Sequence, residues 1–375
     1  MILKRVVVTG LGALTPIGNN IGDFWQGLAS GKSGGAPITY YDTSKSKIKF
    51  ACELKNFDIS DFLDRKEHRR MDKFTQYAMV STEEAINDSG LDLDSIDKLR
   101  VGVIWGSGIG GIETFQNEIL NFAAGDGTPR FNPFFIPKLI GDIAPGHIAI
   151  KYGFMGLNYA TVSACASSAN ALADSLNYIR LGHCDIIVAG GSEAGVNIAG
   201  MSGFSAMRAL STRNDSPSTA SRPFDATRDG FVLGEGSGTL ILEEYEHAKA
   251  RGAKIYAELT GYGATSDGYD MVAPSGEGAV RCMKMALDTA RNKMDYINTH
   301  GTSTPVGDIT ELRGVGETFG ADVPKISSTK SLSGHPLGAA SVHEAIYCLI
   351  MMKNSFITGS ANIVDMDDEA KKFPI

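Results

Sequence analysis

Short apolar, β-branched runs alternate with longer stretches of helical periodicity along the first two thirds of the chain. Continuous apolar strands that are each followed by an amphipathic helix are typical of a mixed or parallel sheet buried on both faces. The pattern therefore predicts an α/β fold. The expected strands cover residues 4–8, 101–105, 159–162, 185–189 and 239–243, and the clearest helices cover 73–89 and 166–181.

A second series of strands and helices begins near Lys254 and repeats this alternation. We expect two similar halves, residues 1–250 and 251–375, which pack together as one domain. The second series stops after three strands, so we expect it to lack counterparts of the last two strands of the first half. Its strands are expected at 255–260, 296–298 and 326–328, and its helices at 278–293 and 338–353.

Composition limits the class of protein. The chain has 375 residues, of which 43% are hydrophobic and 21% charged, as in an ordinary globular protein with a large core. Its net charge of −8 argues against a surface dominated by nucleic-acid binding. No apolar run approaches the ~20 residues of a membrane span, and the N-terminal apolar stretch is too short for a signal peptide. The five cysteines are odd in number and lack CxxC spacing, which disfavours disulfides and zinc and favours the cytoplasm.

Cys165 lies in the run YATVSACASSANALADSLNYIRLG, where an apolar strand is expected to give way to a helix. Only small residues surround it, so a substrate can approach the thiol. The N–H groups and the dipole of a helix N-terminus favour an anion, so we expect this position to ease thiolate formation. A cysteine considered alone is more often an inert core residue, and we interpret the other four cysteines in that way.

His300 in INTHGTSTPVGD and His335 in TKSLSGHPLGAA each lie in a turn of small and hydroxyl-bearing residues. A loop of such low bulk lets an imidazole reach a substrate. A neutral imidazole can then donate a hydrogen bond to a developing oxyanion or enolate. A thiol and two histidines of this kind indicate acyl chemistry.

Two glycine-rich turns, at residues 8–18 and 106–111, follow expected strands and suggest a nucleotide site. Neither is followed by an acidic residue at the end of a second strand, and the two YxxxK pairs lie away from where a dehydrogenase would need them. We interpret these glycines as tight turns. A nicotinamide-dependent dehydrogenase is therefore the least favoured function.

Five motifs occur in a fixed order between about Val6 and Asn362, namely VVVTGLG, SACASSAN, SRPFDATRDGFVLGEGSG, NTHGTSTPVGD and SSTKSLSGHPLGAA. In these motifs the chain resembles the β-ketoacyl-[acyl-carrier-protein] synthases, the elongating condensing enzymes of fatty acid synthesis, and within them the branch with two histidines. The resemblance implies a thiolase-like fold, with a mixed five-stranded sheet in each half and helices in αβαβα layers. Other segments are similar to synthase I or to synthase II, so the subtype stays open.

The resemblance implies a decarboxylating Claisen condensation that needs no organic cofactor. Cys165 would accept an acyl group as a thioester, malonyl-acyl carrier protein would lose CO2, and His300 and His335 would donate hydrogen bonds to the enolate. Lys330 would support His335 or the local electrostatics. The resemblance also implies roles for Thr302 and Thr304 at the pantetheine arm and for Ile109 and Phe204 in the acyl pocket. Glu311, Glu344 and Asn298 would lie behind the site, where a structural monovalent cation is compatible with the family.

The implied partner, acyl carrier protein, is acidic like this chain, so docking requires a local basic patch. The resemblance favours docking over the alternative, a solvated helix face. It also implies a homodimer. The expected docking residues are Arg65, Lys66, Arg69 and Arg70, which form the densest positive cluster, together with Arg130, Lys138 and Arg208.

The chain departs from the family pattern in two places. Family members continue past the point where this sequence stops, with a GFGG-type turn that carries a gating phenylalanine and part of the oxyanion hole. Ser341 stands where the family usually has glycine. A chain that stopped at Ile375 is expected to condense weakly and to be less stable. A non-catalytic partner subunit is therefore the alternative function, although Cys165, His300 and His335 argue against it.

Overall fold

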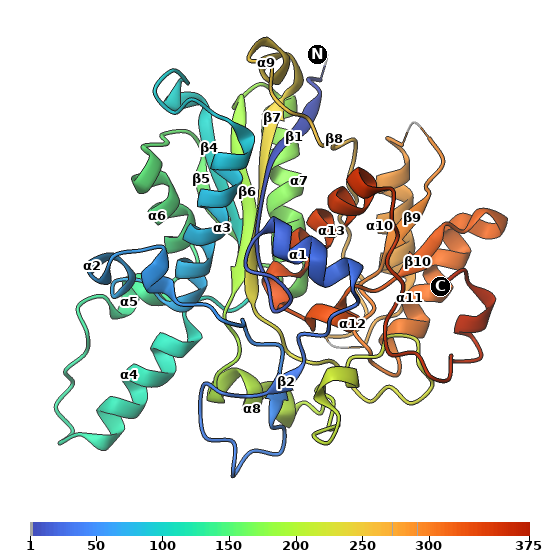
Figure 1. Ribbon diagram of the computed structural model, residues 1–375, viewed down its shortest axis with the longest axis horizontal. Helices are drawn as coiled ribbons and strands as arrows, with labels where there is room; N and C mark the ends of the chain where they lie inside the picture. The colour runs from blue at the N-terminus through green and yellow to red at the C-terminus, as the bar shows by residue number, and fades with distance from the viewer. Residues whose placement is uncertain (1–2, 272, 291) are drawn as a thin grey trace.

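A computed structural model describes residues 3–271, 273–290 and 292–375. Six strands form its central sheet, namely β1 (Val6–Leu14), β4 (Val101–Gly106), β5 (Asn158–Thr161), β6 (Ile186–Glu193), β7 (Gly236–Glu244) and β8 (Ala257–Glu258). Their order is β5-β4-β6-β7-β1-β8 (Figure 1). β7 runs antiparallel to β1 and β6, whereas β4 runs parallel to β5 and β6. The sheet is therefore mixed, as predicted.

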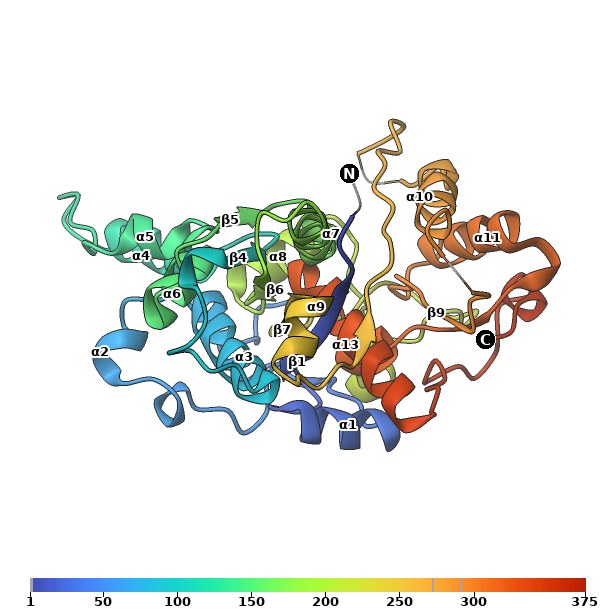
Figure 2. The same ribbon diagram turned by 90° about the horizontal axis from the view of Figure 1, so that it is seen from above.

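Helices cover both faces of this sheet (Figure 2). α3 (Lys73–Ser89) packs on β1, β6 and β7 with α6 (Ile143–Tyr152) beside it, while α7 (Ser167–Arg180) and α13 (Ala340–Asn354) pack on the other face. Every residue of β1, β6 and β7 is buried, because apolar side chains alternate between two cores. The helix predicted at 73–89 is confirmed, and the helix predicted at 166–181 is α7.

The second half contributes strands to two different sheets. β9 (Tyr296–Asn298) and β10 (Lys325–Ser327) form a separate parallel pair, and α10 (Glu277–Leu287) packs against α11 (Gly307–Phe319). β8 pairs instead with β1, whose free backbone edge it covers. Counterparts of β6 and β7 are absent from the described part of this half, as predicted.

One predicted helix of the second half differs in extent. The helix expected at 278–293 ends at Leu287, and residue 291 lies outside the described residues. The remaining elements are α1 (Ile21–Ala29), β2 (Ala36–Pro37), β3 (Phe50–Ala51), α2 (Arg65–His68), α4 (Ile112–Ala124), α5 (Phe135–Leu139), α8 (Ile198–Ala206), α9 (Tyr245–Ala250) and α12 (Lys330–Ser333). The five cysteines are free. Among the residues that are described, no helix has the length and apolar character needed to cross a membrane.

Candidate active site

Cys165 lies in a single 3₁₀ turn, Ala164–Ala166, between the end of β5 and the start of α7. This is the strand-to-helix junction that the sequence predicted. The Ser167 hydroxyl donates to the carbonyl of Ala164 at 2.7 Å and accepts from the N–H of Ser163 at 3.0 Å. Ala164 has a φ of +50°, a left-handed conformation that costs a non-glycine residue about 1–2 kcal/mol. The serine therefore holds a strained turn that presents the thiol.

The fold brings Cys165, His300 and His335 together from distant parts of the sequence. Nε2 of His335 lies 2.9 Å from Sγ of Cys165. The two imidazole rings meet edge to face, with centroids 5.1 Å apart. The sulfur and one nitrogen of each histidine all lie within 4.8 Å of one another. An acyl carbonyl bound to the sulfur would therefore lie beside two imidazoles.

His335 is held mainly by its surroundings. Its backbone N–H donates to the carbonyl of Val232 at 2.8 Å, and its side chain is 2% exposed. The ring packs edge-on against Phe231, with centroids 5.4 Å apart, and Phe231 packs in the same way against Phe204 of α8. The imidazole is therefore directed at Cys165 by close aromatic packing.

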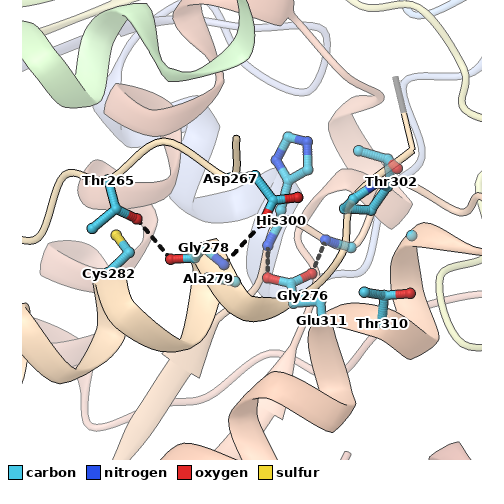
Figure 3. Close-up of a pocket in the computed structure, with 13 residues that line it drawn as sticks. Thr265, Asp267, Gly276, Gly278, Ala279, Cys282, His300, Thr302, Thr310 and Glu311 are labelled. Carbon is cyan, nitrogen blue, oxygen red and sulfur yellow. Dashed lines mark hydrogen bonds between the residues drawn. The ribbon is translucent and has the colours of Figure 1, made fainter. Parts of the chain in front are cut away.

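His300 lies two residues after the end of β9, and Glu311 of α11 fixes its backbone. One carboxylate oxygen of Glu311 accepts from the N–H of His300 at 2.7 Å, and the other accepts from the N–H of Gly301 at 2.8 Å (Figure 3). His300 borders a cavity of about 380 Å³, together with Cys282 and Thr302. The cavity offers an extended ligand a path to the imidazole.

A buried ion pair lies behind the two histidines. Lys330, at the start of α12, is 2% exposed and pairs with Glu344 of α13. Burial raises the pKa of Glu344, and the Lys330 ammonium opposes this effect. The ammonium also acts on both histidines and on the thiol. The Lys330 charge therefore lowers the pKa of both histidines and of the thiol, which is the electrostatic support expected from the sequence.

Both imidazoles are shifted toward their neutral form. Burial lowers the pKa of His335 far below its ordinary value, and His300 and Lys330 lower it further. Desolvation and the Lys330 charge also lower the pKa of His300. Because the His300 side chain is exposed to solvent, we expect its shift to be the smaller one. Near pH 7 each neutral ring can donate one hydrogen bond.

The thiol of Cys165 is harder to ionise than the sequence suggested. Burial raises its pKa, the Lys330 charge opposes this effect, and Glu193 and Glu344 add to it. A backbone hydrogen bond at Cys165 does lower the pKa, in the direction expected from the sequence, but desolvation of the buried thiol outweighs it, so the expectation of an eased thiolate is corrected. The resting nucleophile at neutral pH is a thiol.

Alkylation of Cys165 by iodoacetamide should follow a pH curve whose midpoint lies above the value of a free thiol, about 8.5. Only the thiolate reacts, so a raised pKa moves the curve to higher pH. The rate is measured by mass spectrometry of the Cys165 peptide between about pH 6 and pH 10. A midpoint below that of a free thiol would show that the helix N-terminus outweighs burial.

The residues expected to bind substrate lie in two places. Ile109 and Phe204 pack with Cys165 at the edge of one apolar cluster. The hydroxyls of Thr302 and Thr304 lie 3.2 Å apart, and Thr302 borders the cavity beside His300. The thiol therefore has an apolar wall beside it, and the neighbouring imidazole has a cavity that the Thr302 side chain borders.

Asn298 is the last residue of β9 and precedes His300 by two residues. Its side-chain amide donates to the hydroxyl of Thr329 at 3.2 Å. Thr329 immediately precedes Lys330 at the start of α12. Asn298 therefore helps to connect β9 with the helix that carries the buried lysine.

Six of the seven basic residues expected to dock a carrier protein are exposed, and Lys138 is half-buried. Arg65 and Lys66 lie in α2, and the guanidinium of Arg70 lies 5.2 Å from the ring centroid of Phe134, next to α5. This contact joins α2 to the segment that carries Arg130 and Lys138. Arg69 is exposed beside Arg70, and Arg208 is exposed after α8, a helix that contacts α4.

Three residues near the thiol were not singled out from the sequence. Phe231 packs on His335, and Glu193 is a buried carboxylate at the end of β6. Ser341 was noted only as a departure from the family pattern, and its hydroxyl donates to the carbonyl of Cys165 at 3.3 Å. Neither Phe231 nor Glu193 has a signal of its own in the sequence, because their contacts join segments that are distant along the chain.

The glycine-rich turns do not offer a phosphate site. In GSGIGG the N–H groups of Gly108 and Ile109 donate to Glu193. In VTGLG the N–H group of Leu11 donates to Asp88, and the segment is part of β1. Because these donors are already paired, neither segment offers a nucleotide site. The interpretation as a turn holds for the segment after Gly106 but is wrong for residues 8–14, which form part of β1.

Comparisons with known proteins agree with the motifs. The sequence matches the family models of the beta-ketoacyl synthase N-terminal domain over residues 3–248 and C-terminal domain over residues 256–364. A protein named 3-oxoacyl-[acyl-carrier-protein] synthase 2 from Staphylococcus aureus is 47% identical over 374 residues, covering 98% of this chain and 90% of that protein.

Solved structures share the fold over nearly the whole chain. A beta-ketoacyl synthase from Burkholderia phymatum has a TM-score of 0.91 and 35% identity, covering 99% of this chain and 91% of that one. A type II polyketide ketosynthase in complex with its acyl-carrier protein has a TM-score of 0.87 and 31% identity, covering 100% of this chain and 94% of that one. The thiolase-like fold is confirmed, and the chain belongs to the β-ketoacyl synthase family of acyl-transferring condensing enzymes.

Proposed function

We propose that the protein is a β-ketoacyl-[acyl-carrier-protein] synthase that elongates fatty acyl chains by decarboxylating condensation. The contact of 2.9 Å between Sγ of Cys165 and Nε2 of His335 carries this proposal. A non-catalytic partner subunit has no need for a thiol held against one imidazole with a second imidazole beside it. Both histidines are neutral, which suits donation to an enolate.

In the first half-reaction, Sγ of Cys165 attacks the carbonyl carbon of an acyl thioester carried by acyl carrier protein. The new C–S bond forms as the bond to the carrier sulfur breaks. The thiol proton ends on the departing carrier thiolate, and Nε2 of His335 keeps its own proton, which it donates toward the sulfur. The acyl chain then lies beside Ile109 and Phe204, which pack next to the thiol.

In the second half-reaction, malonyl-acyl carrier protein loses CO2 when the bond between the carboxylate and the α-carbon breaks. The electron pair stays as an enolate, and N–H groups of His300 and His335 donate to its oxygen. The α-carbon then attacks the carbonyl carbon of the Cys165 thioester, and the C–S bond breaks to release the Cys165 thiolate, which takes up a proton. The product is a β-ketoacyl chain two carbons longer.

The reaction needs no organic cofactor, because the carrier brings an activated thioester. The oxygens of Asn298, Glu311 and Glu344 are those that a structural monovalent cation would use. Both oxygens of Glu311 accept one hydrogen bond each, which leaves lone pairs for such an ion. We also propose that residues 1–250 and 251–375 form the two halves of one ketosynthase domain.

Turnover tests the function. The purified protein is incubated with acyl- and malonyl-acyl carrier protein, and the products are followed by mass spectrometry. A β-ketoacyl product and release of CO2 are expected. A folded protein that forms no product, but binds nicotinamide cofactors, would support the dehydrogenase instead.

Charge reversal of Lys66 and Arg69 to glutamate is expected to raise the KM for acyl carrier protein by about tenfold, with kcat little changed. Two attractive charges become repulsive toward an acidic partner, which weakens encounter and docking. A matched control is the reversal of Lys371 and Lys372, which are exposed near the C-terminus on the far side of the molecule (Figure 1). An equal rise of the KM for acyl carrier protein in both double variants would contradict docking at Lys66 and Arg69.

The protein is further proposed to act in the cytoplasm as a homodimer. β5 is an edge strand of the sheet. Three apolar side chains near it are exposed: Val162 just after β5, Leu120 on α4 and Ile136 on α5. An open edge beside apolar side chains is suited to pairing with a second copy.

Val162→Lys is expected to convert a particle of two chains into single chains, because a charge would be buried in the interface. Light scattering coupled to size-exclusion chromatography gives the mass. The control Val364→Lys places the same change on another exposed valine. A dimer that survives Val162→Lys but not Val364→Lys would place the interface elsewhere.

A further inference from the structure

Glu193 is a buried carboxylate that the proposed mechanism does not use. It is 1% exposed and ends β6. Its Oε2 accepts from the N–H of Gly108 at 2.7 Å and from the N–H of Gly338 at 3.0 Å. Its Oε1 accepts from the N–H of Ile109 at 3.2 Å and from the Ser107 hydroxyl at 3.1 Å. All four partners are neutral donors.

These donors belong to two loops that both reach the thiol. The loop of residues 107–109 carries Ile109, which packs against the same apolar cluster as Cys165, and a Cβ atom on Gly108 would lie 3.4 Å from the carbonyl oxygen of Ala164. The loop of residues 335–338 carries His335, whose Nε2 contacts the sulfur. A Cβ atom on Gly338 would lie 2.3 Å from the nitrogen of Gly108 and 2.8 Å from the Glu193 carboxylate. The carboxylate therefore lies where the two loops cross.

We propose that Glu193 is a positioning residue for the condensation, whose carboxylate ties the acyl-pocket loop of residues 107–109 to the histidine loop of residues 335–338. This inference rests on the proposed function. By joining the loops, Glu193 fixes the distance between the wall against which the acyl chain lies and the imidazole beside the sulfur. A displacement of either loop by about 1 Å is enough to slow a reaction up to 100-fold.

A carboxylate is the group that this position requires. Four donors converge on two oxygens, and an ionised carboxylate accepts without donating. Glutamine has the same shape, but its NH2 group would face N–H donors on one side. Glu193→Gln therefore loses the charge and sets donor against donor, with little change in volume.

The charge of Glu193 also acts on the nucleophile, which gives a second readout. Burial is the main reason that the pKa of Cys165 is raised; among the nearby charges, Lys330 lowers it, while Glu193 and Glu344 raise it. Removal of the Glu193 charge is therefore expected to move the alkylation curve of Cys165 to lower pH. Loss of packing alone would not give this direction.

The experiment compares Glu193→Gln with the unaltered protein in two assays. The first is the single-turnover rate of acyl transfer from acyl carrier protein to Cys165, which is expected to fall by about tenfold or more, with a larger effect on kcat than on KM. The second is the pH dependence of Cys165 alkylation, whose midpoint is expected to fall. Wild-type values in both assays would overturn the proposal.

Two further variants keep the test decisive. Glu53→Gln removes another buried carboxylate, which accepts hydrogen bonds from Thr39 and Tyr40, and should leave the alkylation midpoint unchanged. An equal shift in Glu53→Gln would overturn the proposal.

If Glu193→Gln does not fold, Ser107→Ala removes one of the four bonds and should give a smaller fall in transfer rate. If the unaltered protein transfers no acyl group, the proposed function fails and the positioning role fails with it, whereas the alkylation midpoint still tests whether the Glu193 charge acts on Cys165.

Discussion

Cys165→Ala is expected to lower condensation turnover by about 10⁴-fold or more, because the variant has no atom on which to hold the acyl group. Decarboxylation of malonyl-acyl carrier protein should continue, since His300 and His335 still donate to the enolate. The two activities are measured side by side, as β-ketoacyl product and as released CO2. Loss of condensation without loss of decarboxylation would assign the thiol to acyl transfer and the histidines to stabilisation of the enolate.

The matched control is Cys184→Ala, which removes a buried thiol at a distance from the site. It should leave the ratio of condensation to decarboxylation unchanged. Residual condensation by Cys165→Ala at more than about one hundredth of the wild-type rate would contradict covalent catalysis through this residue.

Lys330→Met is expected to lower the free energy of unfolding by about 3–5 kcal/mol, because it leaves the Glu344 carboxylate in a buried position without its partner. The double variant Lys330→Met with Glu344→Gln should recover much of this loss. Both free energies are obtained from urea denaturation followed by circular dichroism.

An exposed ion pair serves as the control for this prediction. Lys284 and Glu317 pair at the surface, with side chains that are 56% and 66% exposed. Lys284→Met should cost about 0–1 kcal/mol, as is usual for exposed pairs. A double variant no more stable than Lys330→Met alone would mean that packing around the lysine, rather than the unpaired charge, sets the cost.

The sequence predicted most elements of the fold because their signals are local. The helix Lys73–Ser89 and the strand Tyr296–Asn298 agree with their predictions residue for residue. Each depends on periodicity within one segment and on residues that begin or end an element. The partner of β8 was not predictable in this way, because strand pairing depends on which edge is free in three dimensions.

The candidate site was predictable in its residues but less so in its electrostatics. The motifs indicated Cys165, His300 and His335, and the fold brings them within 4.8 Å. The pKa of the thiol was expected to fall because the helix N-terminus is visible in the sequence. Burial and the charges of Glu193 and Glu344 are visible only in the fold, and they raise it.

Other contacts at the site join residues with no signal of their own. Phe231 packs on His335 from a different segment, and Glu193 accepts bonds from loops before and after it in the chain. Aromatic residues and carboxylates are common, so neither stands out in one sequence. Their roles follow from which segments the sheet brings together.

Acceptance of an acyl group by Cys165 as a thioester is the step on which the proposed reaction depends. Mass spectrometry of the protein after incubation with acyl-acyl carrier protein, followed by peptide mapping, tests it most directly. We expect an added mass equal to the acyl group on the Cys165 peptide, its removal by hydroxylamine, and its absence in Cys165→Ala. A folded protein that stays unmodified, or that carries the acyl group on another cysteine, would contradict the claim.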